Sequence, residues 1–185
     1  PRSTLMRSSA ASDVYKRQIT DRSMASVFLG KQGGFAPCTP SACMKILDHY
    51  SIDCTGKKAV VIGRSPVVGK PAAMMLLQKN ATVTICHTKT TDMPSVVKEA
   101  DIVIVAAGRA GVIDAKYLRA GQTVIDVGIN VNEEGKLCGD VSFADAEPLV
   151  DAITPVPGGV GSVTTSVLVE HVVDAALLKA GLDIL

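Results

Sequence analysis

The chain alternates short runs of β-branched and other apolar residues with longer segments in which apolar residues recur every three to four positions. Short apolar runs bounded by glycine or polar residues are typical of buried strands, and the longer period is typical of amphipathic helices. The runs that predict strands are 58–62, 81–86, 102–106 and 123–127, with a shorter one at 153–154. Because helical segments separate these strands, the sequence predicts an α/β fold: a Rossmann-like, doubly wound parallel sheet in a single domain.

The segments between the strands predict the helices. Thr39 and Pro40 predict a helix start, with Thr39 as the N-cap and Pro40 at the first helical position. Residues 19–37 are rich in small and polar side chains and predict a loop. The last helix is mostly apolar, so we expect it to be buried on more than one side. The other expected elements are helices at 67–79, 92–99, 145–150 and 164–181, a turn capped by Asp114, and a hairpin at 130–139.

The turn that follows the first predicted strand has the composition of a phosphate-binding turn. Gly63 allows a sharp bend, Ser65 stands where the usual G-x-G-x-x-G fingerprint has its second glycine, and Gly69 is a displaced third glycine. The amides of 67–69 open a helix whose N-terminus attracts anions, and Arg64 adds a planar cation suited to phosphate. A surface turn before a core helix would have the same composition, so this turn alone leaves both interpretations open.

The second predicted strand distinguishes between these interpretations, because it ends in Cys86, His87, Thr88 and Lys89. In dinucleotide-binding folds an acidic residue at this position bonds the ribose 2′-hydroxyl of NAD, whereas basic groups accommodate the 2′-phosphate of NADP. The sequence has no Asp or Glu there. It therefore predicts a nucleotide site and favours NADP over NAD.

The first 18 residues differ in character from the rest. They are rich in Ser and Arg, and they lack the amphipathic period of a transit peptide. The segment SSAASDVYKRQ resembles translated vector or adapter sequence. We therefore expect 1–18 to be a non-native or disordered tail, 19–57 to be a junction loop and linking helix, and 58–185 to be the NAD(P)-binding domain. Tyr15 and Lys16 are accordingly not taken for a catalytic pair.

Composition agrees with a single buried parallel sheet. Hydrophobic residues make up 47% of the chain but aromatic residues only 3%, which is typical of a core built from Val, Ile, Ala and Leu. The net charge of +1 gives no electrostatic case for binding nucleic acid or an anionic membrane, and we expect no apolar run long enough to span a bilayer. The five cysteines show neither a C-x-x-C pair nor zinc spacing, so we expect reduced thiols, no metal and a cytoplasmic protein.

Loops at the carboxyl ends of the strands are where ligands bind in such folds. We expect 63–69, 106–111 and 126–130 to meet there, with 155–161 next along the chain. The glycines of 155–161 expose backbone groups that can meet a flat ring. The loop at 106–111, taken alone, is better explained as a simple connection.

Single polar residues give weaker signals. Asp126 and Asp140 are expected to be turn or cap residues, His49 a solvated helix residue, and His171 a packed and hydrogen-bonded one. His87 differs, because it ends the strand beside the expected ribose. No spacing supports a Ser-His-Asp or Cys-His arrangement or a pair of carboxylates for general acid–base catalysis.

Six segments resemble, in order, the motifs of one enzyme family. They are GRSPVVGKPAAMMLL, ATVTICHTKT, ADIVIVAAGRAG, VIDVGIN, GDV and ITPVPGGVGSVTTSVLVEHVV. Together they resemble the bifunctional methylenetetrahydrofolate dehydrogenase/cyclohydrolase of the bacterial FolD type, over about residues 19–185. The resemblance implies the C-terminal NADP-binding domain of that family, with NADP as cofactor, a folate substrate in the full-length enzyme, and a homodimer.

The resemblance also implies roles for individual residues. On the cofactor side these are Gly63, Arg64, Ser65, Val68, Gly69, His87, Thr88 and Ile129. On the folate and nicotinamide side they are Pro157, Gly158, Gly159, Val160, Gly161 and Thr164. Ser162 and Val163 stand where many members have Pro-Met, so the family's contacts at those two positions do not transfer to this chain.

The family's catalytic residues are expected outside this sequence. Members carry a Tyr-x-x-x-Lys pair in a separate N-terminal domain, and an Asp that holds the pterin in a D-V-D-G segment at the domain junction. The sequence has neither feature, and Asp13 is not expected to take over the folate role. No catalytic residue is therefore assigned, and the chain as given is expected to bind cofactor without turnover.

Two other functions are compatible with the same residues. One is a nucleotide-sensing or interaction domain that keeps the fold without chemistry. The other is a shikimate-dehydrogenase-like oxidoreductase, a group that also has a degenerate turn and a basic end to the second strand. For the assembly, we expect 83–86 and 102–106 near a sheet edge, where pairing with a second copy is possible.

Overall fold

The computed structural model describes residues 18–31 and 34–182. The predicted tail, with Asp13, Tyr15 and Lys16, lies outside the described residues except for Gln18. That residue corrects the tail boundary, because its side chain is only 2% exposed and its Nε2 donates to Cys38 Sγ at 2.8 Å. Gln18 is therefore part of the folded region rather than a disordered segment.

Five parallel strands form the central sheet in the order β2-β1-β3-β4-β7. Ile62 at the end of β1 pairs with Cys86 of β2 and with Val105 of β3, and Val105 pairs with Asp126 of β4. The carboxyl ends of these four strands therefore lie along one edge of the sheet, as expected. The strands are β1 (Lys58–Ile62), β2 (Thr82–Cys86), β3 (Ile102–Val105), β4 (Thr123–Asp126) and β7 (Ala152–Ile153).

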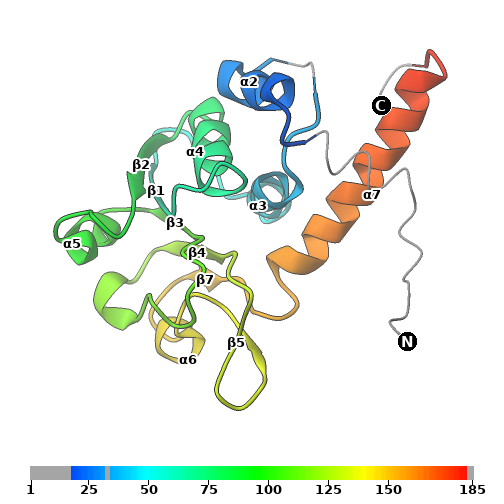
Figure 1. Cartoon of the computed structure of the whole chain (residues 1–185). Helices are drawn as coiled ribbons and strands as arrows, with labels where there is room; N and C mark the ends of the chain where they lie inside the picture. Colours follow the sequence, from blue (N-terminus) through cyan, green and yellow to red (C-terminus); the bar gives the residue numbers. More distant parts are fainter. Residues whose placement is uncertain (1–17, 32–33, 183–185) are drawn as a thin grey trace.

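Helices cover both faces of this sheet, which confirms the doubly wound α/β fold (Figure 1). On one face lie α3 (Cys38–His49) and α4 (Gly69–Gln78). On the other lie α5 (Met93–Lys98), the 3₁₀ turn η1 (Ala115–Tyr117) and α6 (Phe143–Ala146). The predicted hairpin is present as β5 (Asn130–Val131) paired with β6 (Leu137–Cys138), and the side chain of Asp114 caps η1 as predicted.

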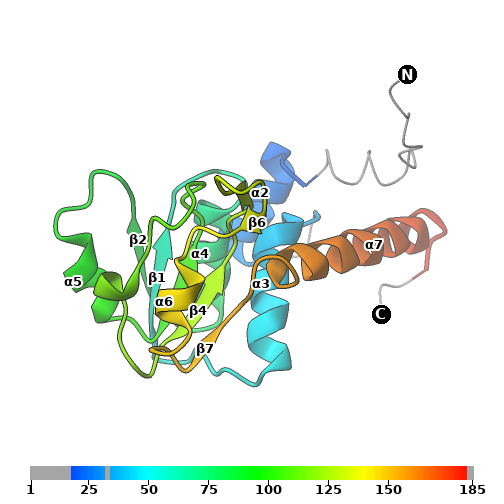
Figure 2. The same ribbon diagram turned by 90° about the horizontal axis from the view of Figure 1, so that it is seen from below.

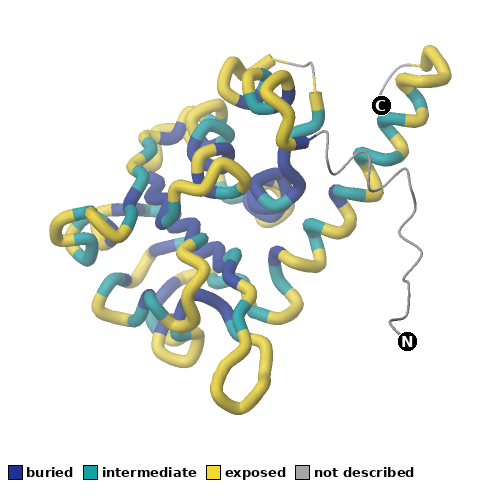
Figure 3. Tube along the Cα trace, viewed as in Figure 1, coloured by how far each residue is buried: buried dark blue, intermediate teal, exposed yellow. Residues whose placement is uncertain are grey.

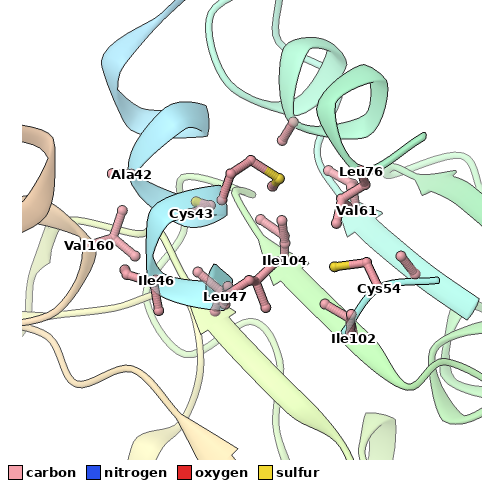
Figure 4. Close-up of a cluster of buried hydrophobic side chains, with 14 of the residues drawn as sticks. Ala42, Cys43, Ile46, Leu47, Cys54, Val61, Leu76, Ile102, Ile104 and Val160 are labelled. Atoms are coloured by element: carbon pink, nitrogen blue, oxygen red, sulfur yellow. The ribbon is translucent and has the colours of Figure 1, made fainter. Parts of the chain in front are cut away.

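The two faces are built from alternate residues of the same strands. Val61 and Ile104 pack on the α3 side of the sheet, whereas Val60 and Val103 pack on the α5 side. Figure 4 shows the first of these clusters, in which Leu47 of α3 and Leu76 of α4 close over the sheet. Because successive side chains of a strand point to opposite faces, a strand covered on both sides must be apolar at every position, as β3 is.

The segment 19–37 is not a loop throughout, because it contains helix α2 (Asp21–Leu29). Thr20 is the N-cap, and its Oγ1 accepts from the Ser23 amide at 3.3 Å. Gly30 ends the helix in the left-handed conformation, with φ +64°. The small and polar side chains of α2 give it only a weak apolar period. Thr20 and Gly30, which cap its two ends, are the sequence features that could have indicated this helix.

Several helix boundaries also differ from the prediction. α3 begins at Cys38 with Pro37 as its N-cap, so Thr39 and Pro40 lie in its first turn rather than at its cap. α4 begins at Gly69 rather than at 67, and α6 covers 143–146 rather than 145–150. Pro40 is tolerated because an amide in the first turn of a helix has no intrahelical partner to lose.

The last helix, α7 (Val160–Lys179), begins four residues earlier than predicted and is far less buried. Only Val160 and Val167 are buried, and α7 packs mainly against α3. Figure 2 shows α7 extending away from the sheet, and Figure 3 shows that it is largely exposed or half-buried. Val169 and Val173 are 59% and 52% exposed. The expectation of burial on more than one side is therefore wrong for this chain by itself.

By length and composition, α7 also meets the requirement for a membrane span, contrary to the sequence-based expectation that no run does so. The other helices in the described part of the chain do not. Glu170 and Asp174 lie in the middle of α7. Acidic side chains near a bilayer centre cost several kcal/mol, on the order of 3 each, so the sequence of α7 does not favour insertion.

The expected sheet edges are confirmed for one strand only. β2 is an outer strand of the sheet, whereas β3 lies between β1 and β4. The segment 102–106 is therefore not near an edge, and the complete burial of β3 explains why it is so uniformly apolar.

Candidate functional site

Two glycines shape the turn between β1 and α4. Gly63 has φ +130°, and a Cβ built on it would overlap the carbonyl oxygen of Ala106 at the end of β3. A Cβ on Gly69 would overlap the carbonyl group of Gly63. The turn, the start of α4 and the end of β3 therefore approach one another at backbone distance. Only glycine fits these two positions without moving the neighbouring backbone.

Ser65 caps the helix that follows this turn. Its Oγ accepts from the amides of Val68 and Gly69 at 3.0 and 3.4 Å. These two amides, which were predicted to face an anion, thus donate to the serine oxygen. Because that oxygen accepts both bonds, its own hydroxyl hydrogen stays available to donate to a phosphate oxygen. The serine thereby presents the donor at the positive end of the α4 dipole.

The residues predicted for the ribose side lie beside the turn. The Gly63 amide donates to the Cys86 carbonyl at 2.9 Å, which places Arg64 next to the residues that follow β2. His87 is half-buried, and its Nδ1 accepts from the Lys89 amide at 3.1 Å, so the neutral ring carries its proton on Nε2. The side chains of Arg64 and Thr88 are exposed to solvent. This edge offers donors and no carboxylate.

Asp126 and Asp140 tie the neighbouring loops together. Asp126 Oδ1 accepts from the amides of Gly128 and Asp140 at 2.9 and 3.0 Å, and its Oδ2 accepts from Val141 at 2.9 Å. Asp140 accepts from the Gly108 amide and from the Asn130 side chain. Burial raises the pKa of the Asp126 carboxyl; the three amide bonds oppose this, and the nearby Asp140 carboxylate adds to it. Both residues thus have the turn-fixing role that the sequence predicted.

The loop after β7 forms the other half of the site. A cavity of about 290 Å³ lies between 155–162 and the loop that follows β4. Ile129 lines it and is 68% exposed, and Gly161 is its close neighbour. The residues predicted for the substrate side that line this cavity are Pro157, Gly158, Gly159, Val160 and Gly161. These glycines leave room for a flat ring to approach the backbone.

Thr164 is the one residue of the predicted substrate side that does not line this cavity. Its Oγ1 donates to the Val160 carbonyl at 2.9 Å, inside α7. It lines a separate cavity of about 120 Å³, together with Val67 of the phosphate turn and Cys38. Thr164 therefore faces the space between α7 and the turn rather than the Ile129 side.

A larger hollow, about 1000 Å³, lies elsewhere. It runs between α3 and strands β4 and β7, and it is lined mostly by apolar atoms of these elements. It shares Gly158 and Gly159 with the substrate-side loop but contains none of the predicted cofactor residues. A dinucleotide binds at the carboxyl ends of parallel strands, so we place the site at the smaller cavities and not in this hollow.

A partly buried polar cluster that the sequence did not indicate joins α7 to α3. Gln18 Nε2 donates to Cys38 Sγ and lies 3.3 Å from His171 Nδ1, and the His171 ring packs against Phe35 at 5.3 Å. Burial raises the pKa of the Cys38 thiol and lowers the pKa of His171, so both groups are neutral near pH 7. The packed role expected for His171 is confirmed. Gln18 carried no signal, because its partners lie 20 and 153 residues away.

All five cysteines are free thiols, and only Cys138 is more than slightly exposed. Among residues 18–31 and 34–182, no three His, Cys, Asp or Glu side chains are grouped so that they could hold a metal ion.

Comparison with known proteins shows which family this chain resembles. Residues 37–180 match the family described as tetrahydrofolate dehydrogenase/cyclohydrolase, NAD(P)-binding domain. The bifunctional protein FolD of Carboxydothermus hydrogenoformans is 55% identical over 166 residues, which are 89% of this chain and 58% of that protein. The chain thus spans a little over half the length of such relatives.

Solved structures agree with the match. The bifunctional FolD methylenetetrahydrofolate dehydrogenase/cyclohydrolase of Campylobacter jejuni has a TM-score of 0.86 and 44% identity, covering 88% of this chain and 58% of that one. The Trypanosoma brucei enzyme, solved with NADP and an inhibitor, has a TM-score of 0.79 and 34% identity, covering 88% and 57%. The family match over 37–180 includes the turn, the ribose edge and the substrate-side loop.

Proposed function

The chain belongs to the tetrahydrofolate dehydrogenase/cyclohydrolase family, as its NAD(P)-binding domain, and on this basis we propose that it binds NADP through the turn at 63–69. The observation that carries the proposal is the combination of that glycine cradle with a ribose edge of Arg64, His87 and Thr88. A side chain at Gly63 or Gly69 would overlap the neighbouring backbone. Arg64, His87 and Thr88 supply hydrogen-bond donors, and none of the three is acidic. The residues present therefore suit a phosphorylated dinucleotide.

Each part of the site has a task toward this cofactor. The Ser65 hydroxyl and the α4 N-terminus would meet the pyrophosphate, and Arg64 with Thr88 would hold the 2′-phosphate. Val68 and Gly69 would let the α4 backbone come close, while Ile129 and the 157–161 loop would border the nicotinamide. Bound there, NADP would supply a hydride acceptor. The chain's own contribution is to orient the ring and keep water from one side of it.

Replacing Arg64 with alanine should remove most of the preference for NADP over NAD. A charge-assisted bond to phosphate contributes roughly 1.5–3 kcal/mol, so the affinity for NADP should fall about tenfold or more. The affinity for NAD, which lacks the 2′-phosphate, should change little. Calorimetric titration of both cofactors measures the two values.

Lys57→Ala serves as the matched control, because Lys57 is an exposed cation at the opposite, amino end of β1. It removes the same charge without touching the ribose edge and should leave both affinities as they were. Equal losses from Arg64→Ala and Lys57→Ala would show that net charge, and not a contact, produces the preference.

For the whole enzyme we propose the activity of the relatives: NADP-dependent oxidation of methylenetetrahydrofolate, followed by hydrolysis of the methenyl product in one-carbon metabolism. The cavity between Ile129 and the 157–161 loop supports this, because it gives a flat pterin ring access to the nicotinamide side. The catalytic side chains are proposed to come from the part of the relatives' length that this chain does not match.

The outer side of α7 is a suitable surface for that additional part. Val169, Val173 and Leu178 are each more than half exposed, whereas the opposite side of the helix packs on α3. A helix that is apolar all round usually has neighbours on more than one side. We propose that the folate-binding domain of the family covers this surface, next to the cavities at the start of α7.

We propose a homodimer that forms through the free edge of β2. Thr82 and Thr84 are exposed on this outer strand, and an open edge offers unpaired backbone groups to a second copy. Light scattering at micromolar concentration should give twice the mass of the chain. Changing both threonines to lysine should give a monomer, because like charges would face each other across the two-fold axis. A monomeric wild-type chain would contradict the proposal.

The charge and the composition of the chain bear on its other partners and on its location. With a net charge of +1 there is no basic field to attract nucleic acid. The acidic residues of α7 make it a poor membrane anchor, and free thiols suit a reducing compartment. We propose a cytoplasmic protein whose ligands are the nucleotide and the folate.

A further inference from the structure

Asp140 lies where the loops of three different strands meet. It follows β6 and is fully buried. Its Oδ2 accepts from the Gly108 amide at 2.7 Å, and its Oδ1 accepts from Asn130 Nδ2 at 2.8 Å. Gly108 belongs to the loop after β3, and Asn130 ends the loop after β4. One carboxylate therefore sets the spacing of two loops that border the cofactor cleft.

The loop after β3 is in turn the support of the phosphate turn. A Cβ on Gly63 would overlap the Ala106 carbonyl, so these two backbones are already in contact. The far end of the same loop is held by the Asp140 segment, because the Gly111 amide donates to the Gly139 carbonyl at 3.2 Å. A shift of Asp140 would therefore move the loop after β3, which contacts the phosphate turn at Gly63. Through its bond to Asn130, it would also move the loop that carries Ile129.

The Asp140 carboxylate is not explained by a contribution to the stability of the fold. In the described part of the chain, no cation pairs with Asp140 or with Asp126. The two acids are adjacent, since the Asp140 amide donates to Asp126 Oδ1 at 3.0 Å. Two neighbouring buried carboxylates without a cation oppose folding. Residues that are unfavourable for stability are often found at functional sites, where their position is needed for binding or catalysis.

We propose that Asp140 is a positioning residue for the cofactor: by holding Gly108 and Asn130 at a fixed spacing, it sets the opening between the loops after β3 and β4 that receives the middle and the nicotinamide half of the dinucleotide. The inference rests on the proposed function. It assigns no role at the 2′-phosphate, which lies at the other end of the site beside Arg64 and Thr88.

The test exchanges the two partners. Asn130→Asp places a second carboxylate opposite Asp140 and should push the loops apart. The double change Asn130→Asp with Asp140→Asn restores a donor and an acceptor, since the new amide at position 140 can donate to the new carboxylate at position 130 and accept from Gly108. Each protein is titrated with NADP and with adenosine 2′,5′-bisphosphate, which reaches only the ribose-phosphate end. Gln122→Ala is the stability control, because Gln122 is a buried hydrogen-bonded residue at the amino end of β4.

For Asn130→Asp we expect NADP affinity to fall about tenfold or more, with adenosine 2′,5′-bisphosphate affinity kept within about twofold. The double variant should recover NADP affinity to within about threefold of wild type. Gln122→Ala should lower the melting temperature and leave both affinities in place. Unchanged NADP affinity in Asn130→Asp, equal loss of both ligands, or no recovery in the double variant would overturn the inference. Failure of the wild-type chain to bind NADP would instead overturn the proposed function, and the inference with it.

Discussion

The Gly69→Ala variant should lose tight NADP binding. The added methyl group would overlap backbone atoms of Gly63 and Arg64 rather than a movable side chain, so the turn itself must shift. Overpacking of this kind costs about 1–3 kcal/mol, which corresponds to about 5- to 150-fold in affinity if it acts on the binding geometry. The methyl group would also disturb the cap that Ser65 makes on α4. Calorimetric titration with NADP and a melting curve measure the two effects.

Gly56→Ala is the matched control for this prediction. Gly56 has φ +70° and open space around its Cα, and it precedes β1 at the opposite edge of the sheet. Alanine there should cost about 1–2 kcal/mol of stability through the left-handed backbone alone. NADP affinity should remain that of the wild type. If Gly69→Ala kept full affinity, or if both variants lost it equally, the turn would not be the phosphate site.

Joining the chain to the N-terminal part of a relative should produce the second large effect. We expect the 185-residue chain to bind NADP but to form no NADPH from methylenetetrahydrofolate. Positioning the substrate against the nicotinamide can supply roughly 7–11 kcal/mol of a barrier, and side-chain proton transfer about 10²–10⁴-fold in rate. The residues for both tasks are proposed to lie outside the 58% of the Carboxydothermus FolD protein that this chain matches.

The experiment uses a spectrophotometric assay on the chain alone and on the chain fused behind the N-terminal region of the FolD protein of Carboxydothermus hydrogenoformans. The fused protein should be active, and its Gly69→Ala form should not, because it lacks a place for the cofactor. Comparable rates from the chain alone and the fused protein would show that the catalytic centre lies within this sequence. A fused protein that binds NADP but stays inactive would favour a nucleotide-binding domain without chemistry.

The sheet was predictable because most strand positions are apolar and because β3, at its centre, is buried at every position. β1 coincides with its predicted range, and β2, β3 and β4 differ by one residue at one end. Helix starts were less predictable, because a cap depends on backbone geometry. α4 shows this: Ser65 caps it through its side chain, and the helix begins at Gly69 rather than at 67.

The burial of the last helix, α7, could not be predicted from its pattern of apolar residues. The apolar composition of α7 indicates that it needs neighbours on more than one side, but composition does not say whether those neighbours belong to this chain. In the structure Val167 is buried against the body, while Val169, two positions on, is 59% exposed. The prediction of burial was wrong because the described residues supply α7 with a neighbour on one side only.

At the site, the sequence indicated groups that act through their own side chain or through a glycine, such as Gly63 and Arg64. It gave little on residues that act through distant backbone amides. Asp140 bonds an amide 32 residues earlier in the chain, and no spacing rule links the two. Such contacts depend on which strand ends the fold brings together, and they appear only once the sheet order is known.

The central claim is that this chain has a site for NADP at the carboxyl edge of its sheet, and titration of the wild-type chain with NADP and with NAD tests it most directly. The ribose edge holds Arg64, His87 and Thr88 without a carboxylate. Binding should be one molecule per chain, with NADP at least about tenfold tighter than NAD. Equal affinities, a preference for NAD, or no binding of either cofactor would contradict the account.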